Sequence, residues 1–174
     1  MKGIVGGTFD PPHNGHVALA EAARSQLPID QLEIWVEESP GHRGVFADPQ
    51  TRLKLSQAAF PGFDVRLDPH PFTVDAVRGR EEALFVVGAD QAAELHRWKD
   101  PEEVLEWVKL AVGTRGGFET PDLSRWGDRV VPFELASPEV SSSEVRERVA
   151  AGETIDDLVP PAVARLIEEL GLYR

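Results

Sequence analysis

The sequence predicts an α/β protein, a Rossmann-like open parallel sheet with helices on both faces. Short apolar runs, each the length of a buried strand, alternate along the chain with longer segments whose apolar residues have helical spacing. Strands that are apolar on both faces and are separated by helices are typical of a parallel sheet with right-handed crossovers. The expected strands are Ile4-Val5 and residues 32–36, 63–67, 83–87, 110–112 and 129–133.

Helices are expected where apolar residues recur at helical spacing. The expected helices are residues 16–27, 50–60, 142–150 and 160–170. The last of them opens at Pro160-Pro161 and ends at Gly171. Its apolar stripe consists of Val163, Leu166, Ile167 and Leu170. Because a chain of 174 residues is long enough for one sizeable core and short for two, we expect a single domain over residues 1–174, with 160–174 as a C-terminal packing helix.

The charge balance narrows the range of partners. The chain has 18 Lys and Arg against 30 Asp and Glu, a net charge of -12, which argues against a nucleic-acid partner but leaves room for a small phosphate ligand where cations gather. There is no cysteine, which excludes disulfides, thiolate metal sites and a cysteine nucleophile. No run is apolar enough for a signal peptide or a membrane span, so we expect a cytoplasmic protein without a membrane partner.

The first strand ends in a glycine-rich turn that opens the first helix. The turn reads Gly6-Gly7-Thr8-Phe9-Asp10-Pro11-Pro12-His13-Asn14-Gly15-His16. Two glycines let the backbone approach a ligand closely, and a helix N-terminus presents amide donors to an anion. His13 and His16 are three residues apart, so both imidazoles can face one phosphate. The alternative is a tight strand-to-helix turn with two ordinary histidines.

A second candidate anion site opens a later helix. The segment Ser141-Ser142-Ser143-Glu144-Val145-Arg146 follows the last expected strand. Serines at a helix start cap free backbone amides, and Arg146 lies one turn after Ser143 on the same face. These groups can grip an anion, although serine caps with a surface arginine are also common.

Together, the two segments resemble the paired phosphate motifs of the nucleotidyltransferase superfamily, in the same order along the chain. Val140 and Ser143 stand where the later motif normally has Ile and Thr. The resemblance implies that the catalytic residues are His13, His16 and Arg146, acting on ATP without a covalent enzyme intermediate. It also implies an ATP site that includes Gly7, Thr8, Phe9, Asn14, Ser142 and Ser143.

A third segment resembles the bacterial nicotinate mononucleotide adenylyltransferases of this superfamily. It reads Phe85-Val86-Val87-Gly88-Ala89-Asp90 and is followed by Leu95 and Trp98. The resemblance implies that Gly88 and Asp90 hold a nucleotide ribose as part of the ATP site. On the mononucleotide side, it implies that Trp98 stacks on the pyridine ring beside Thr73. The alternatives are a helix cap for Asp90 and core packing for Trp98.

The resemblance extends over nearly the entire chain, with further matches in residues 71–75, 112–115 and 158–173. One departure is the loop Pro40-Gly41-His42-Arg43, which usually reads Pro-Pro-His-Lys; here a stiff proline becomes glycine and a lysine becomes a planar guanidinium. We expect His42 and Arg43 to bind the mononucleotide. Arg52 is expected either at a phosphate or on a solvated helix face.

A second departure is Pro71-Phe72-Thr73, which usually reads Ser-Tyr-Thr and here lacks a hydroxyl. The two remaining histidines, His70 and His96, are expected at the surface.

The resemblance implies adenylyl transfer from ATP, with Mg²⁺, to nicotinate mononucleotide, giving deamido-NAD and pyrophosphate. The expected partners are ATP and nicotinate mononucleotide. Alternatives are nicotinamide mononucleotide as acceptor, a relative that uses phosphopantetheine or transfers cytidylate to a small alcohol phosphate, and a regulatory module that binds nucleotides without catalysis. The sequence alone does not decide between the two mononucleotides, nor does it give an oligomeric state.

Overall fold

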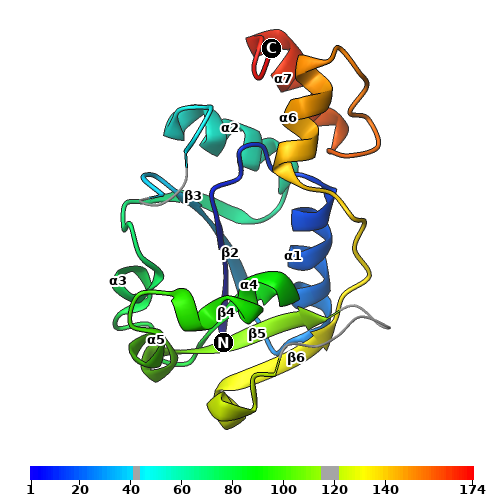
Figure 1. Cartoon of the computed structure of the whole chain (residues 1–174). Coiled ribbons are helices and arrows are strands. Elements are labelled where there is room, and N and C mark those ends of the chain that lie inside the picture. Colours follow the sequence, from blue (N-terminus) through cyan, green and yellow to red (C-terminus); the bar gives the residue numbers. More distant parts are fainter. Residues whose placement is uncertain (41–43, 115–121) are drawn as a thin grey trace.

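The computed structural model describes residues 1–40, 44–114 and 122–174, and it contains one six-stranded sheet (Figure 1). The strands are β1 (Lys2–Gly7), β2 (Gln31–Glu37), β3 (Asp64–Asp68), β4 (Ala83–Gly88), β5 (Val108–Thr114) and β6 (Val130–Glu134). The helices are α1 (Asn14–Gln26), α2 (Pro49–Ala59), α3 (Thr73–Val77), α4 (Ala89–Ala93), α5 (Pro101–Trp107), α6 (Ser142–Ala150) and α7 (Pro161–Leu170), with 3-10 helices at Leu95–Arg97 and Ser124–Arg129.

All neighbouring strands pair in parallel, in the order β3-β2-β1-β4-β5-β6. The chain therefore builds outward from β1 to β3, returns to place β4 on the other side of β1, and builds outward again to β6. Ligands of such sheets bind beyond the carboxyl ends of the strands at the point where the order reverses, which here lies between β1 and β4.

The two faces of the sheet bury separate clusters of side chains, as the predicted fold requires. On one face, Val5 and Val86 pack with α1, α2, α6 and α7; on the other, Ile4 and Phe85 pack with α3, α4 and α5. Successive residues of one strand thus serve opposite layers, which explains why the strands are apolar along their whole length. The predicted parallel sheet with helices on both faces is confirmed.

The C-terminal helix packs against α2, with Val163 and Ile167 buried. The expected stripe is wrong at Leu170, which is 44% exposed because the helix stops there. Figure 1 shows α6, α7 and the C-terminus at the same end of the molecule as the loop that joins β1 to α1. None of the helices in the described parts of the chain has both the length and the apolar character that a bilayer crossing requires.

Candidate active site

The loop between β1 and α1 is folded tightly around Phe9. Phe9 adopts a left-handed backbone (φ 50°) and is only 2% exposed; its ring meets the edge of the Phe60 ring at 5.6 Å and that of the His16 ring at 4.9 Å. A Cβ at Gly7 would lie 3.1 Å from the Phe9 ring, so a residue without a side chain suits this position. Phe9, expected to line the ATP site, therefore has its side chain beneath the loop, and only its backbone is available to a ligand.

The two histidines of the loop lie against each other. Their rings stack with centroids 3.6 Å apart, and the backbone N–H of His13 donates to Nδ1 of His16 at 3.2 Å. A Cβ at Gly15 would come within 3.1 Å of the His13 ring, so glycine leaves room for this stacking at the start of α1. The sequence prediction that both imidazoles face one place at the helix N-terminus agrees with this geometry.

Both imidazoles are neutral at physiological pH. Burial lowers the pKa of His13 to about 4, and burial together with the neighbouring His13 lowers the pKa of His16 well below its ordinary value. Because Nδ1 of His16 accepts a hydrogen bond, the proton of the neutral ring is assigned to Nε2. His16 is thus an uncharged hydrogen-bond donor, and a bound phosphate would favour its protonated form.

The start of α6 lies directly against this loop. The hydroxyl of Ser142 donates to the carbonyl of Pro11 at 2.8 Å, and Arg146 donates to the carbonyl of Asp10 at 2.7 Å. Arg146 also donates to the hydroxyl of Ser143 at 3.0 Å. The two segments predicted to share a phosphate site are therefore brought together, with the N-termini of α1 and α6 side by side.

Two residues expected to bind ATP also have contacts within the protein. Asn14 donates from its backbone to the carbonyl of Leu158 (2.9 Å) and from its side-chain amide to the carbonyl of Asp157 (3.1 Å), so it anchors the C-terminal segment on the loop. Thr8 donates its hydroxyl to Glu37 at 2.9 Å. The side chain of Thr8 joins the ends of β1 and β2.

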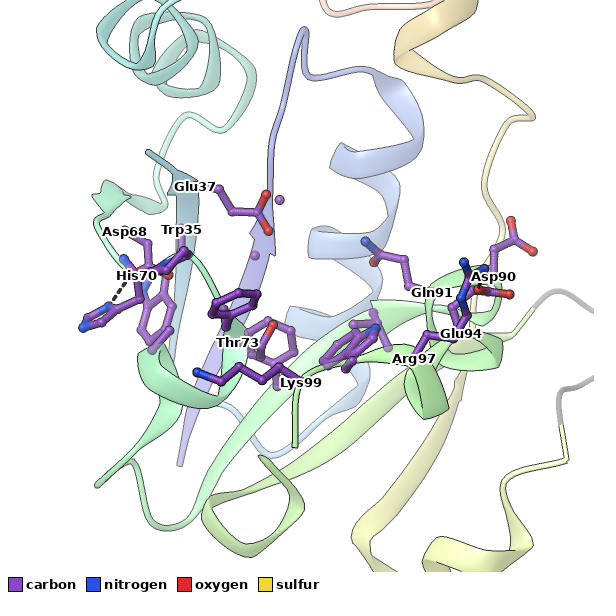
Figure 2. A pocket seen from close by; sticks show the side chains of 18 residues that line it. Trp35, Glu37, Asp68, His70, Thr73, Asp90, Gln91, Glu94, Arg97 and Lys99 are labelled. Carbon is purple, nitrogen blue, oxygen red and sulfur yellow. Dashed lines mark hydrogen bonds and ion pairs between the residues drawn. The ribbon is translucent and has the colours of Figure 1, made fainter. Parts of the chain in front are cut away.

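A pocket of about 770 Å³ opens beside the loop, at the carboxyl ends of β1, β2 and β4 (Figure 2). Four of the predicted site residues line it: Gly7, Thr73, Asp90 and Trp98. Within the described parts of the chain, a Cβ at Gly88 would meet no atom within 4 Å, so the strand end leaves open space there. The other described site residues do not line this pocket. Gly7 belongs both to the pocket lining and to the loop between β1 and α1.

Aromatic side chains form much of the pocket wall. Trp35, Phe72, Phe85 and Trp98 all line it, and Trp98 meets the edge of the Phe85 ring with centroids 6.0 Å apart. Trp98 is partly exposed rather than buried in the core, so its ring is available to a flat ligand.

Charged groups of both signs stand around the same pocket. Lys99 lies over the Phe72 ring at 4.6 Å and bonds to Asp75 at 3.2 Å. In Figure 2, Glu37 reaches in from the end of β2, whereas Asp90 and Arg97 stand on the opposite side. The pocket therefore offers carboxylate acceptors for hydroxyl groups as well as cations for an anionic group.

His70 and His96 are exposed, as expected. His70 nevertheless lines the pocket, where Nδ1 lies 2.6 Å from Asp68. His42 and Arg43, expected to bind the mononucleotide, lie outside the described residues.

Arg52 corrects both expectations made for it. The side chain is completely buried, and it donates to the carbonyls of Ala47, Thr8, Glu37 and Glu38 at 2.6–3.1 Å. Four of its five N–H groups are used in this way. Arg52 is therefore neither a phosphate contact nor a solvated residue. Its side chain connects α2 to the chain at the ends of β1 and β2.

Asp10 and Tyr173 form a contact that was not expected from the sequence. Asp10 is 4% exposed, and its carboxylate accepts from the Tyr173 hydroxyl and from the backbone amides of Phe46 and Ala47. These partners are 36 to 163 residues away in sequence, so no local pattern reveals them.

Comparison with known proteins gives matches along the whole chain. Residues 4–148 match the cytidylyltransferase-like family. A relative from Rubrobacter xylanophilus is 34% identical, with 99% of this chain and 91% of the relative covered. A relative from Rhodopirellula baltica is 33% identical, with 99% and 92% covered. Both bear the name "Probable nicotinate-nucleotide adenylyltransferase".

The architecture also has a counterpart among solved structures. The nicotinic acid mononucleotide adenylyltransferase of Plasmodium falciparum, complexed with NaAD, superposes with a TM-score of 0.81 over 99% of this chain and 96% of that chain. The two sequences are 16% identical, so this likeness establishes the shared fold.

Proposed function

The chain belongs to the cytidylyltransferase-like family, and on this premise we propose that it transfers the adenylyl group of ATP to nicotinate mononucleotide. The products are deamido-NAD and pyrophosphate. The acceptor is supported by the names of the full-length relatives, nicotinate-nucleotide adenylyltransferases. The observation that carries the proposal is the meeting of the two helix N-termini, through the Ser142–Pro11 and Arg146–Asp10 hydrogen bonds, next to an aromatic pocket.

The reaction needs alignment and charge neutralisation rather than a protein nucleophile. A 5′-phosphate oxygen of the mononucleotide forms a bond to the α-phosphorus of ATP, while the bond from that phosphorus to the bridging oxygen breaks and pyrophosphate leaves. A phosphate oxyanion is already nucleophilic, so no side chain needs to form a covalent intermediate. ATP enters with a divalent cation, for which we propose Mg²⁺, and this cation neutralises part of the phosphate charge.

The leaving pyrophosphate is bound between α1 and α6 in this proposal. The positive ends of both helix dipoles favour an anion there, and Nε2 of His16 and the guanidinium of Arg146 act as donors to it. His13 supports His16 by stacking on it. These donors stabilise the charge that develops in the transition state, and the cation bound with ATP would neutralise part of it.

The mononucleotide occupies the 770 Å³ pocket, which adjoins the loop at Gly7. Trp98 presents a flat face for the pyridine ring, and Thr73 at the start of α3 lies on the same wall. Asp90 and the open strand end at Gly88 serve the ribose of ATP. Acceptor and ATP phosphates then meet at the carboxyl ends of β1 and β4.

A comparison of reaction rates with three acceptors tests the proposal. The purified protein is given ATP and Mg²⁺ with nicotinate mononucleotide, nicotinamide mononucleotide or phosphopantetheine in turn, and dinucleotide and pyrophosphate are quantified together. We expect equimolar deamido-NAD and pyrophosphate, with the largest kcat/KM for nicotinate mononucleotide.

His16→Ala should lower kcat by about 10²- to 10³-fold, as loss of one preorganised donor does, and the exposed His96→Ala serves as the matched control. Pyrophosphate released only with phosphopantetheine, or no release with any acceptor, would contradict the proposal.

A further inference from the structure

The C-terminal tail turns back from α7 onto the loop that carries the histidines. Gly171 ends the helix with φ 63°, and the backbone N–H of Leu172 bonds back to the carbonyl of Ile167. Tyr173 also has a left-handed backbone, with φ 62°. This path brings the Tyr173 hydroxyl to 2.6 Å from Oδ1 of Asp10, across 163 residues of sequence.

Asp10 collects three hydrogen bonds on one buried carboxylate. Besides the Tyr173 hydroxyl, it accepts from the backbone N–H of Phe46 at 2.6 Å and from that of Ala47 at 3.3 Å. Burial and the bond to Asp10 raise the pKa of the Tyr173 hydroxyl, so it remains a donor across the physiological range. Loss of one of these donors would leave part of a buried carboxylate without a hydrogen bond, which costs free energy. The side chain and backbone of Asp10 would then be expected to change position.

Asp10 contacts Arg146 directly through its backbone carbonyl and indirectly through Phe46. The backbone carbonyl of Asp10 accepts directly from Nη1 of Arg146 at 2.7 Å. The Phe46 ring, whose backbone the Asp10 carboxylate holds, lies 4.3 Å from the guanidinium carbon of Arg146. Phe46 is 70% exposed, so few contacts other than this backbone bond hold it there.

We propose that Tyr173 is a positioning residue of the ATP-phosphate site: through Asp10, its hydroxyl holds Arg146 and Phe46 in the geometry that binds the leaving pyrophosphate. The inference rests on the proposed function for the identity of the ligand. A tail that only packs against the fold would contribute stability and leave nucleotide affinity unchanged, so the two roles have different signatures.

The test compares Tyr173→Phe, which removes one hydroxyl and keeps the ring, with Arg174→Ala as matched control. Arg174 is the adjacent, exposed residue, and among the residues that the structure describes its side chain bonds only to the carbonyl of Glu168, at 3.5 Å. The measurements are the Kd for α,β-methylene-ATP with Mg²⁺ by calorimetry, the KM values for ATP and for nicotinate mononucleotide, and the thermal unfolding midpoint. We expect Tyr173→Phe to weaken analogue binding and raise the KM for ATP about tenfold, as loss of a hydrogen bond to a charged group does. The KM for nicotinate mononucleotide should stay within about twofold, and Arg174→Ala should match the wild type in every measurement.

A second variant shows whether Tyr173 acts through Asp10. Asp10→Asn keeps the size of the side chain and removes its charge; it should also weaken analogue binding, and combining it with Tyr173→Phe should add little to either single effect. Unchanged analogue affinity in Tyr173→Phe, an equal rise of both KM values, or fully additive effects would overturn the inference. A wild-type protein that binds the analogue but forms no dinucleotide would contradict the proposed function, whereas the binding comparison would still decide the role of Tyr173.

Discussion

The neutral imidazole of His13 makes the stability of the unliganded protein depend on pH. Its pKa is about 4 in the folded protein and near 6.5 when exposed, so between these values the unfolded chain binds a proton that the folded chain does not. This contribution to stability is complete above pH 6.5 and is lost as the pH falls toward 4. The lowered pKa of His16 acts in the same direction.

We expect the unfolding free energy to fall on going from pH 7.5 to pH 5, with about 2 kcal/mol of the decrease due to His13. Urea unfolding at both pH values measures this. His13→Asn keeps a residue favoured at a helix start and should flatten the pH dependence, whereas the exposed His96→Asn should retain the wild-type slope. An identical slope in His13→Asn and the wild type would show that burial of His13 is not its cause.

For single residues, contacts between side chains that are close in sequence could be predicted from the sequence. His13, His16 and Ser143–Arg146 act within one helical turn, so their spacing predicts their juxtaposition. Asp10 and Arg52 could not be understood in this way, because their partners come from distant segments. A buried arginine on a helix has the same local pattern as an exposed one, and only the folded chain shows the carbonyls that surround it.

At the scale of elements, the long strands and helices were predictable and the short helices were not. The four predicted helices lie within two residues of α1, α2, α6 and α7 at each end, because burial of one face imposes a helical period. Helices α3, α4 and α5 have five to seven residues, too few to show a period, and they form because the chain must turn back onto the sheet. Residues of α3 and α4, and of the segments next to them, line part of the pocket, which is why the pocket was predicted only in part.

Arg52 connects helix α2 to the chain at the ends of β1 and β2 through buried hydrogen bonds. Arg52→Met should lower the unfolding free energy by about 3 kcal/mol or more, since four carbonyls lose their donor in a buried place. Lys54→Met, on the exposed side of the same helix, should change it by about 0.5 kcal/mol or less. Denaturant unfolding of both variants provides the comparison, and equal stability of the two would exclude this connecting role.

At the scale of the whole molecule, the C-terminal segments return to the loop between β1 and α1. Asn14 bonds to residues 157 and 158, Arg146 to Asp10, and Tyr173 to Asp10. These contacts support the prediction that residues 1–174 form one domain. They also bring two helix N-termini and Arg146 together in a protein of net charge -12, and such a place favours an anion.

The proposed function requires that the N-termini of α1 and α6 form one binding site for the phosphates of ATP. A crystal structure of the protein with α,β-methylene-ATP and Mg²⁺ tests it most directly. We expect the β- and γ-phosphates between the two helices, within hydrogen-bond distance of Nε2 of His16 and of the Arg146 guanidinium, with the α-phosphate directed toward the pocket at Gly7. A triphosphate bound elsewhere, with His16 and Arg146 free of contact to it, would contradict the claim.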